Sequence, residues 1–119
     1  MAENLFVYGT LKRDHQHKEG RFLSSNSNFL GAGKIKGHLF NMGHYPGLTI
    51  PENTDSWVFG EVYELQHAHK IFNVIDEYEG DGFVRVQKPV FVDGQQLNCW
   101  VYLFIGNTSG LPRRTDGAY

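Results

Sequence analysis

The pattern of hydrophobic and polar positions predicts several β-strands along the chain. Residues 4–8 form a short apolar run that stops at Gly9, which is typical of a buried strand. Residues 57–65 alternate between apolar and polar positions, which predicts another strand. Two more strands are predicted at 83–92 and 97–105, and the segment between them begins with Asp-Gly, a strong signal for a hairpin turn.

Residues 29–41 have an extended pattern that is interrupted by three glycines, Gly31, Gly33 and Gly37. Glycine inside a strand indicates a bend, a bulge or a close approach of two backbones, as occurs at the corners of a barrel. The polar segment from about residue 106 has no core pattern, so it is expected to be loosely ordered.

One long segment has helical rather than strand periodicity. Its apolar residues fall on one helical face: Ile71, Phe72, Ile75 and Tyr78. This spacing predicts a helix that begins near residue 67 and ends before Gly80, a natural C-terminal cap. A brief second helix is expected within residues 17–23.

Four carboxylates crowd the end of the predicted long helix: Asp76, Glu77, Glu79 and Asp81. The C-terminus of a helix carries partial negative charge, so anions are unfavourable there. At about 100° per residue, Glu79 projects onto the apolar face, whereas Glu77 points to water and Asp76 lies on the flank. Lost hydration and the helix dipole both favour the neutral form of Glu79, which makes it a candidate general acid or base. The alternative is a structural ion pair between Glu79 and Arg85.

The first strand runs directly into the sequence Tyr8-Gly9-Thr10. Successive backbone N–H groups at the end of a strand can bind a ligand, and glycine allows the ligand to come close. An ordinary tight turn would explain the same three residues.

Composition and charge narrow the class of protein. With 119 residues, of which 40% are hydrophobic, the chain can build the core of one domain spanning 1–119. A net charge of -2 gives no electrostatic footprint for nucleic acid or an anionic membrane, and no apolar run approaches the roughly 20 residues that span a bilayer. The single cysteine, Cys99, excludes an internal disulfide and indicates a reducing compartment, so we expect a cytoplasmic protein. We also expect a monomer or a weak homodimer.

Five motifs together resemble those of the gamma-glutamylcyclotransferase-like family: FVYGTLK, YPGL, VFGEVYEL, IDEYEG followed by FVR, and CWVYLF. The similarity is greatest to the small bacterial and gamma-glutamylamine cyclotransferase-type branch, and it extends from Leu5 to about Phe104. The resemblance implies an α+β fold, a small mixed-sheet β-barrel with flanking short helices.

The resemblance also implies a reaction, in which the α-amine of a gamma-glutamyl amine or peptide attacks its own γ-carbonyl and releases an amine and 5-oxoproline. Tyr8, Gly9, Thr10 and Leu11 would hold the gamma-glutamyl group, and Glu79 would be the catalytic base. Neither a metal nor a cofactor is implied.

Three further residues are candidates for the substrate pocket: Tyr45, Phe83 and Arg85. Family members often have Tyr in place of Phe83, and the better known members read YGSN where this chain reads YGTL, so their substrates are not transferred to it. Tyr102 is expected in the core, and the pairs His15-x-His17 and His67-x-His69 are expected at the surface rather than at a metal. Two other functions stay open, a non-catalytic module that binds a small ligand in the same pocket and an interaction protein that uses an exposed barrel edge.

Overall fold

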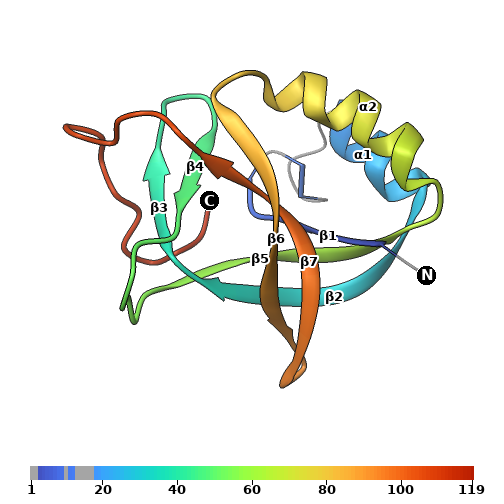
Figure 1. The fold of residues 1–119 in the computed structure, drawn as a ribbon, viewed down its shortest axis with the longest axis horizontal. Helices are drawn as coiled ribbons and strands as arrows, with labels where there is room; N and C mark the ends of the chain where they lie inside the picture. Colours follow the sequence, from blue (N-terminus) through green and yellow to red (C-terminus); the bar gives the residue numbers. More distant parts are fainter. Residues whose placement is uncertain (1–2, 10, 13–17) are drawn as a thin grey trace.

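Residues 3–9, 11–12 and 18–119 are described by the structure, a computed structural model (Figure 1). Its helices and strands, in chain order, are β1 (Glu3–Val7), α1 (Lys18–Ser25), β2 (Ser27–Lys36), β3 (His38–Asn41), β4 (Pro46–Thr49), β5 (Trp57–Leu65), α2 (Ala68–Glu79), β6 (Phe83–Val92) and β7 (Gln95–Phe104).

Five of these strands form a closed barrel in the order β1-β5-β2-β6-β7 (Figure 1). Neighbours pair antiparallel except where β7 returns to β1, a parallel contact between Trp100 and Leu5 that closes the barrel. Strands β3 and β4 form a separate two-stranded hairpin. The expectation of an α+β fold built on a small mixed barrel with short helices is confirmed.

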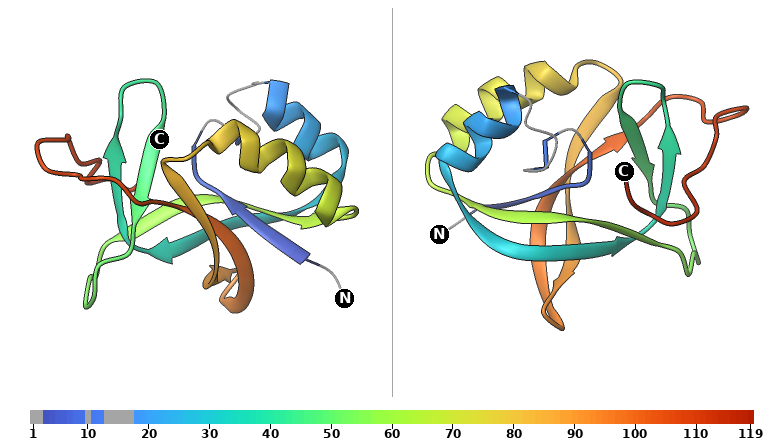
Figure 2. Two further views of the ribbon diagram at one scale, coloured as in Figure 1. Left: turned by 45° about the horizontal axis from the view of Figure 1, so that its top comes forward. Right: turned by 180° about the vertical axis from the view of Figure 1, so that it is seen from behind.

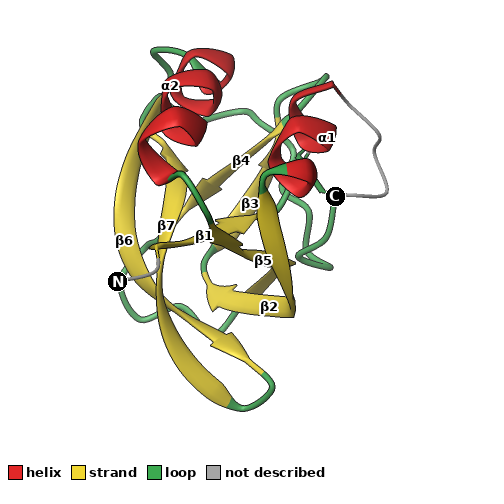
Figure 3. Cartoon of the chain, turned by 90° about the vertical axis from the view of Figure 1, so that its right-hand side faces the viewer, coloured by secondary structure: helices red, strands yellow, loops and turns green. Residues whose placement is uncertain are grey.

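Both helices lie on the same side of the barrel (Figures 2 and 3). The predicted long helix is α2, which buries Ile71, Phe72 and Ile75 and ends before Gly80. The apolar face predicted from its periodicity is therefore the face that packs on the barrel. Among the described residues, neither helix is long and apolar enough to cross a membrane.

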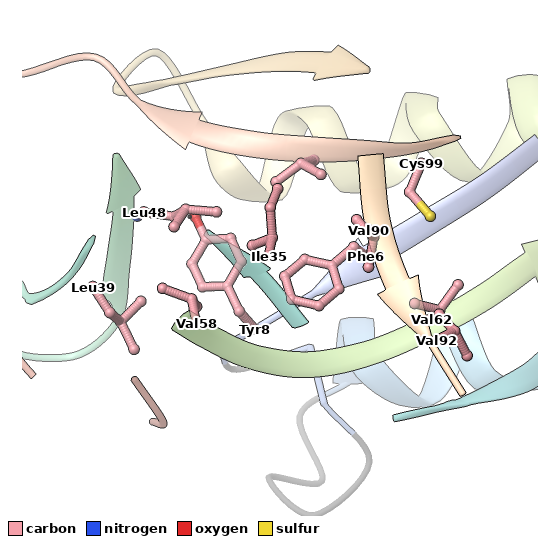
Figure 4. Close-up of a cluster of buried hydrophobic side chains, with 11 residues drawn as sticks. Phe6, Tyr8, Ile35, Leu39, Leu48, Val58, Val62, Val90, Val92 and Cys99 are labelled. Atoms are coloured by element: carbon pink, nitrogen blue, oxygen red, sulfur yellow. Dashed lines mark hydrogen bonds between the residues drawn. The ribbon is translucent and has the colours of Figure 1, made fainter. Parts of the chain in front are cut away.

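Strand β1 is apolar at consecutive positions because both of its faces are covered. Leu5 and Val7 belong to the cluster that packs between the barrel and the helices. Phe6 and Tyr8 belong to the cluster that fills the barrel, beside residues such as Val58 (Figure 4). β1 therefore runs between the two clusters, and Tyr8, which follows Val7, is still buried.

The hairpin between β6 and β7 turns at the predicted dipeptide. Asp93 and Gly94 both have positive φ, 51° and 76°, and they connect the paired residues Val92 and Gln95. Two residues with positive φ form the type I′ turn that matches the twist of the flanking strands. In β2 the register shifts between Phe29 and Gly31, which is the irregularity that glycine in this strand predicted.

The C-terminal tail, expected to be loosely ordered, forms backbone hydrogen bonds with β3 of the separate hairpin and with β5 of the barrel. The carbonyl of Pro112 and the N–H of Arg114 bond to β3, at 2.8 and 2.7 Å. The carbonyl of Gly117 accepts a hydrogen bond of 2.8 Å from β5. These bonds use backbone atoms, which explains why the side-chain pattern of the tail gave no sign of them.

Candidate active site

The end of α2 directs Glu79 toward the barrel. Ile75, one turn earlier, is fully buried and fixes the rotation of the helix. Gly80 ends the helix with φ of 79°, and its N–H donates to the carbonyl of Asp76 at 3.0 Å. Glu79 is consequently half-buried, whereas Glu77 is exposed, as the helical projection predicted.

A narrow cavity lies between Glu79 and the segment that follows β1. Its lining residues are Phe6, Val7, Tyr8, Gly9, Leu11, Tyr45, Pro46, Glu79 and Tyr102. The cavity has a volume of about 20 Å³, enough for one water molecule. The structure therefore brings three of the four predicted binding residues, Tyr8, Gly9 and Leu11, together with Glu79. The fourth, Thr10, lies outside the described residues.

The hydroxyl of Tyr8 is occupied by bonds within the protein. It donates to the carbonyl oxygen of Tyr102 at 2.6 Å and accepts from the N–H of Leu48 at 3.3 Å. Burial, with a smaller effect from the charge of Glu79, raises the pKa of Tyr8 well above its ordinary value. Tyr8 therefore ties the end of β1 to β4 and β7, because its hydroxyl bonds to the backbone of both strands.

A wider depression of about 340 Å³ adjoins the narrow cavity. Its lining residues are Asp76, Glu79, Gly80, Phe83, Val84, Arg85 and Tyr102. Two of the predicted pocket residues, Phe83 and Arg85, thus lie here, while Tyr45 lies in the narrow cavity. The rings of Tyr45 and Phe83 are in contact, with centroids 5.9 Å apart. Glu79 and Tyr102 line both hollows.

Arg85 forms its ion pair with Asp76. Nε of Arg85 lies 2.9 Å from Oδ1 of Asp76, and a terminal nitrogen lies 3.2 Å from Oδ2. The hydroxyl of Tyr102 donates to the same Oδ1 at 2.6 Å. The ion pair that the sequence allowed between Glu79 and Arg85 is formed instead by Asp76, and within the described part of the chain Arg85 does not pair with Glu79, which lines both hollows.

The two carboxyl groups at the end of α2 have pKa values pushed in opposite directions. Burial and then the charge of Asp76 raise the pKa of Glu79 from 4.5 to about 7. Burial also acts to raise the pKa of Asp76, but the hydrogen bonds from Arg85 and Tyr102 and the charge of Arg85 outweigh it and lower that pKa. Near neutral pH, Glu79 can take up and release a proton while Asp76 stays ionised, a pattern typical of acid–base sites.

Residues 5–119 match the family described as gamma-glutamyl cyclotransferase, AIG2-like. The chain belongs to this family. A presumed gamma-glutamylcyclotransferase of Methanocaldococcus jannaschii is 30% identical over 86% of this chain and 84% of its own length. A presumed gamma-glutamylcyclotransferase of Drosophila melanogaster is 29% identical over 87% of this chain and 70% of its own length.

Solved structures share the fold of this member of the gamma-glutamyl cyclotransferase, AIG2-like family. The crystal structure of YkqA from Bacillus subtilis aligns with a TM-score of 0.79 at 23% identity. The alignment covers 100% of this chain and 40% of YkqA, so the chain spans less than half the length of that protein.

Two residues at the hollows of this family member were not identified as site residues from the sequence alone. The sequence pattern predicts Asp76 on the flank of the helix and Tyr102 in the core. Tyr102 is buried, but its hydroxyl reaches Asp76, because β6 and β7 pair Arg85 directly with Tyr102. If Asp93 and Gly94 are taken as a two-residue turn, counting back along both strands pairs Arg85 with Tyr102. The Asp-Gly signal could therefore have identified Tyr102 as a neighbour of Arg85.

The described residues of the chain contain no group of three His, Cys, Asp or Glu side chains arranged to hold a metal ion. His67 and His69 are exposed at the start of α2. His15 and His17 lie outside the described residues. Cys99 is buried in the barrel, and burial raises the pKa of its thiol to about 11.

Proposed function

We propose that this protein is a gamma-glutamyl cyclotransferase that converts a gamma-glutamyl amine or peptide into 5-oxoproline and a free amine, with Glu79 as the general base. The observation that carries the proposal is the position of Glu79, a carboxyl group with a pKa of about 7, at a cavity formed with Tyr8, Gly9 and Leu11. Membership of the family and the two relatives support the same activity.

The reaction needs a group that both accepts and returns a proton. The α-ammonium group of the substrate loses one proton to water, and the resulting amine attacks the γ-carbonyl carbon. As that C–N bond forms, the ring nitrogen gives a second proton to Glu79, which passes it to the leaving nitrogen as the old C–N bond breaks. The released amine takes up a proton from water, which balances the first. With a pKa of about 7, Glu79 can perform both transfers near neutral pH.

The remaining acceleration comes from positioning. Ring closure is intramolecular, so holding the substrate folded lowers the entropic part of the barrier. We assign stabilisation of the developing oxyanion to backbone N–H groups of Gly9 and Leu11, which border the cavity.

The two adjoining hollows suggest how the substrate lies. Glu79 must reach both the α-amine and the leaving nitrogen, and it lines both hollows. We place the gamma-glutamyl group in the narrow cavity and the departing amine in the wider depression. At about 20 Å³ the narrow cavity must widen to admit the substrate, and Tyr45, 43% exposed, is the lining side chain best placed to move.

Replacing Gly9 by Val is expected to abolish substrate binding while leaving a folded protein. A Cβ atom on Gly9 would lie 2.6 and 2.8 Å from Cγ and Cδ of Pro46, so the β4 segment would be forced away from the cavity. Calorimetric titration with a non-cleavable gamma-glutamyl analogue measures the loss. Gly82→Val is the matched control, because the nearest atom to a Cβ there is 3.9 Å away. Unchanged affinity in folded Gly9→Val protein would remove the loop from the substrate site.

Enlarging Val84 is expected to change the choice of leaving amine. Val84 is 41% exposed and lines the wider depression, so Val84→Trp fills space that we assign to the amine. We expect KM to rise about tenfold or more for bulky gamma-glutamyl amines and to change little for gamma-glutamyl methylamide. Val74→Trp, at an exposed position on α2, is the control. Equal effects on large and small amines would place the leaving group elsewhere.

The activity itself is tested by incubating the protein with a panel of gamma-glutamyl amines and peptides and measuring 5-oxoproline by mass spectrometry. We expect 5-oxoproline and amine in equal amounts for at least one substrate. Binding without turnover for every compound that binds would favour the alternative, a module that binds a small ligand in the same pocket.

A further inference from the structure

The Asp76 carboxylate is held in one place although its side chain is 46% exposed. Arg85 binds both of its oxygens, and the Tyr102 hydroxyl binds one of them. Arg85 is itself fixed, because its guanidinium lies 3.7 Å from the ring centre of Phe72 and 4.7 Å from that of Trp100. An exposed carboxylate usually samples many rotamers, so this amount of support for one surface acid needs an explanation.

Glu79 lies three residues after Asp76 on α2, and side chains at this spacing are neighbours on a helix surface. Tyr102, which binds Asp76, also connects it to the two hollows. Tyr102 bonds to Asp76 through its hydroxyl and lines both hollows, and its backbone carbonyl accepts the Tyr8 hydroxyl. The fixed anion, the candidate base and the end of β1 are thus linked by direct contacts.

We propose that Asp76 is a positioning residue for Glu79. Arg85 and Tyr102 hold the Asp76 carboxylate one helical turn before Glu79, and its negative charge keeps on Glu79 the proton that is later given to the leaving amine. The inference rests on the proposed function of Glu79 as the base. In a reaction that must return a proton to a poor leaving group, a carboxylate of ordinary acidity would be too weak a base to collect it.

Among residues 3–9, 11–12 and 18–119, the other groups near Glu79 do not supply such a charge. Tyr8, at the end of β1, and Tyr102, on β7, have raised pKa values and are neutral near pH 7. Arg85 on β6 is bound to Asp76, so its positive charge partly cancels the effect of the Asp76 anion on Glu79. Glu77 and Asp81 are exposed to water, where their charges are screened.

Two substitutions with opposite electrostatic effects test the proposal. Asp76→Asn removes the anion and leaves the Arg85 cation, so the pKa of Glu79 is expected to fall by roughly one unit. Arg85→Gln removes the cation, keeps a donor for Asp76 and is expected to raise the pKa of Glu79. The measurement is an NMR titration of the Glu79 carboxyl carbon, assigned by its absence in Glu79→Gln, on variants whose amide spectra show a folded protein.

Opposite shifts of the Glu79 titration in the two variants support the proposal, and we expect the acidic limb of kcat/KM to move with them. A merely structural role for the Asp76–Arg85 pair would lower the melting temperature of both variants and leave the titration of Glu79 in place. Unmoved titrations, or shifts of the same sign, would overturn the proposal. Because the NMR titration needs no turnover, absence of 5-oxoproline would count against the proposed function and not against the coupling of Asp76 to Glu79.

Discussion

Glu79→Gln is expected to lower the turnover of gamma-glutamyl substrates by about 10²–10⁴-fold, the usual contribution of a general acid or base. Glutamine keeps the shape of the side chain and its capacity for hydrogen bonds, but it cannot carry a proton between the ring nitrogen and the leaving nitrogen. Substrate affinity should change little, because the cavity walls are unaltered. Steady-state kinetics with direct detection of 5-oxoproline measure the loss.

The matched control is Glu77→Gln, the same chemical change two residues earlier on the same helix. Glu77 is exposed and lies outside both hollows, so its replacement should leave kcat and KM close to those of the original protein. Undiminished turnover in folded Glu79→Gln protein would remove Glu79 from the chemistry, whatever the position of its side chain.

The second large effect is a gain in stability from Glu79→Gln that depends on pH. We expect the variant to unfold at a higher temperature than the original protein at pH 8, by several degrees, and to match it at pH 4. Thermal melts of both proteins at the two pH values provide the comparison, and Glu77→Gln again serves as the control.

The sign of this effect follows from the raised pKa of Glu79. Below pH 4.5 the group is protonated in both the folded and the unfolded chain, and its contribution to stability is fully present. Between 4.5 and about 7 only the unfolded chain loses the proton, so the free energy of unfolding falls as pH rises. The shift from 4.5 to about 7 corresponds to a loss of at most about 3.5 kcal/mol, at roughly 1.4 kcal/mol per pKa unit. Glutamine avoids this loss, and a variant that is less stable at pH 8 would show that the carboxylate is stabilised where it lies.

The local parts of the fold could be predicted because each depends on neighbouring residues. The period of the apolar positions gave α2 and, with it, the inward direction of Glu79. The Asp93-Gly94 signal predicted the hairpin of β6 and β7, but the predicted second strand began at residue 97, and only the two-residue turn of the structure pairs Arg85 with Tyr102. These signals are short-range, and the structure preserves them.

Contacts between segments that are distant in the sequence could not be predicted from the pattern of apolar and polar residues. The alternating pattern of residues 57–65 predicts that Phe59, Tyr63 and Leu65 share one face of β5, yet Phe59 is 45% exposed while Tyr63 and Leu65 are buried. The helices cover only one half of the outer face of the strand, and alternation carries no information about which half. The pairing of Arg85 with Asp76 rather than Glu79 likewise depends on how α2 lies across β6 and β7.

The most direct test of cyclisation with Glu79 as the base is to run the reaction in water enriched in oxygen-18 and to measure the mass of the 5-oxoproline by mass spectrometry. Attack by the substrate's own α-amine brings in no oxygen from water, so the product of the original protein should contain no oxygen-18, and Glu79→Gln should form almost none of this product. Glutamate or 5-oxoproline that carries oxygen-18, or equal yields from the two proteins, would contradict the proposed reaction.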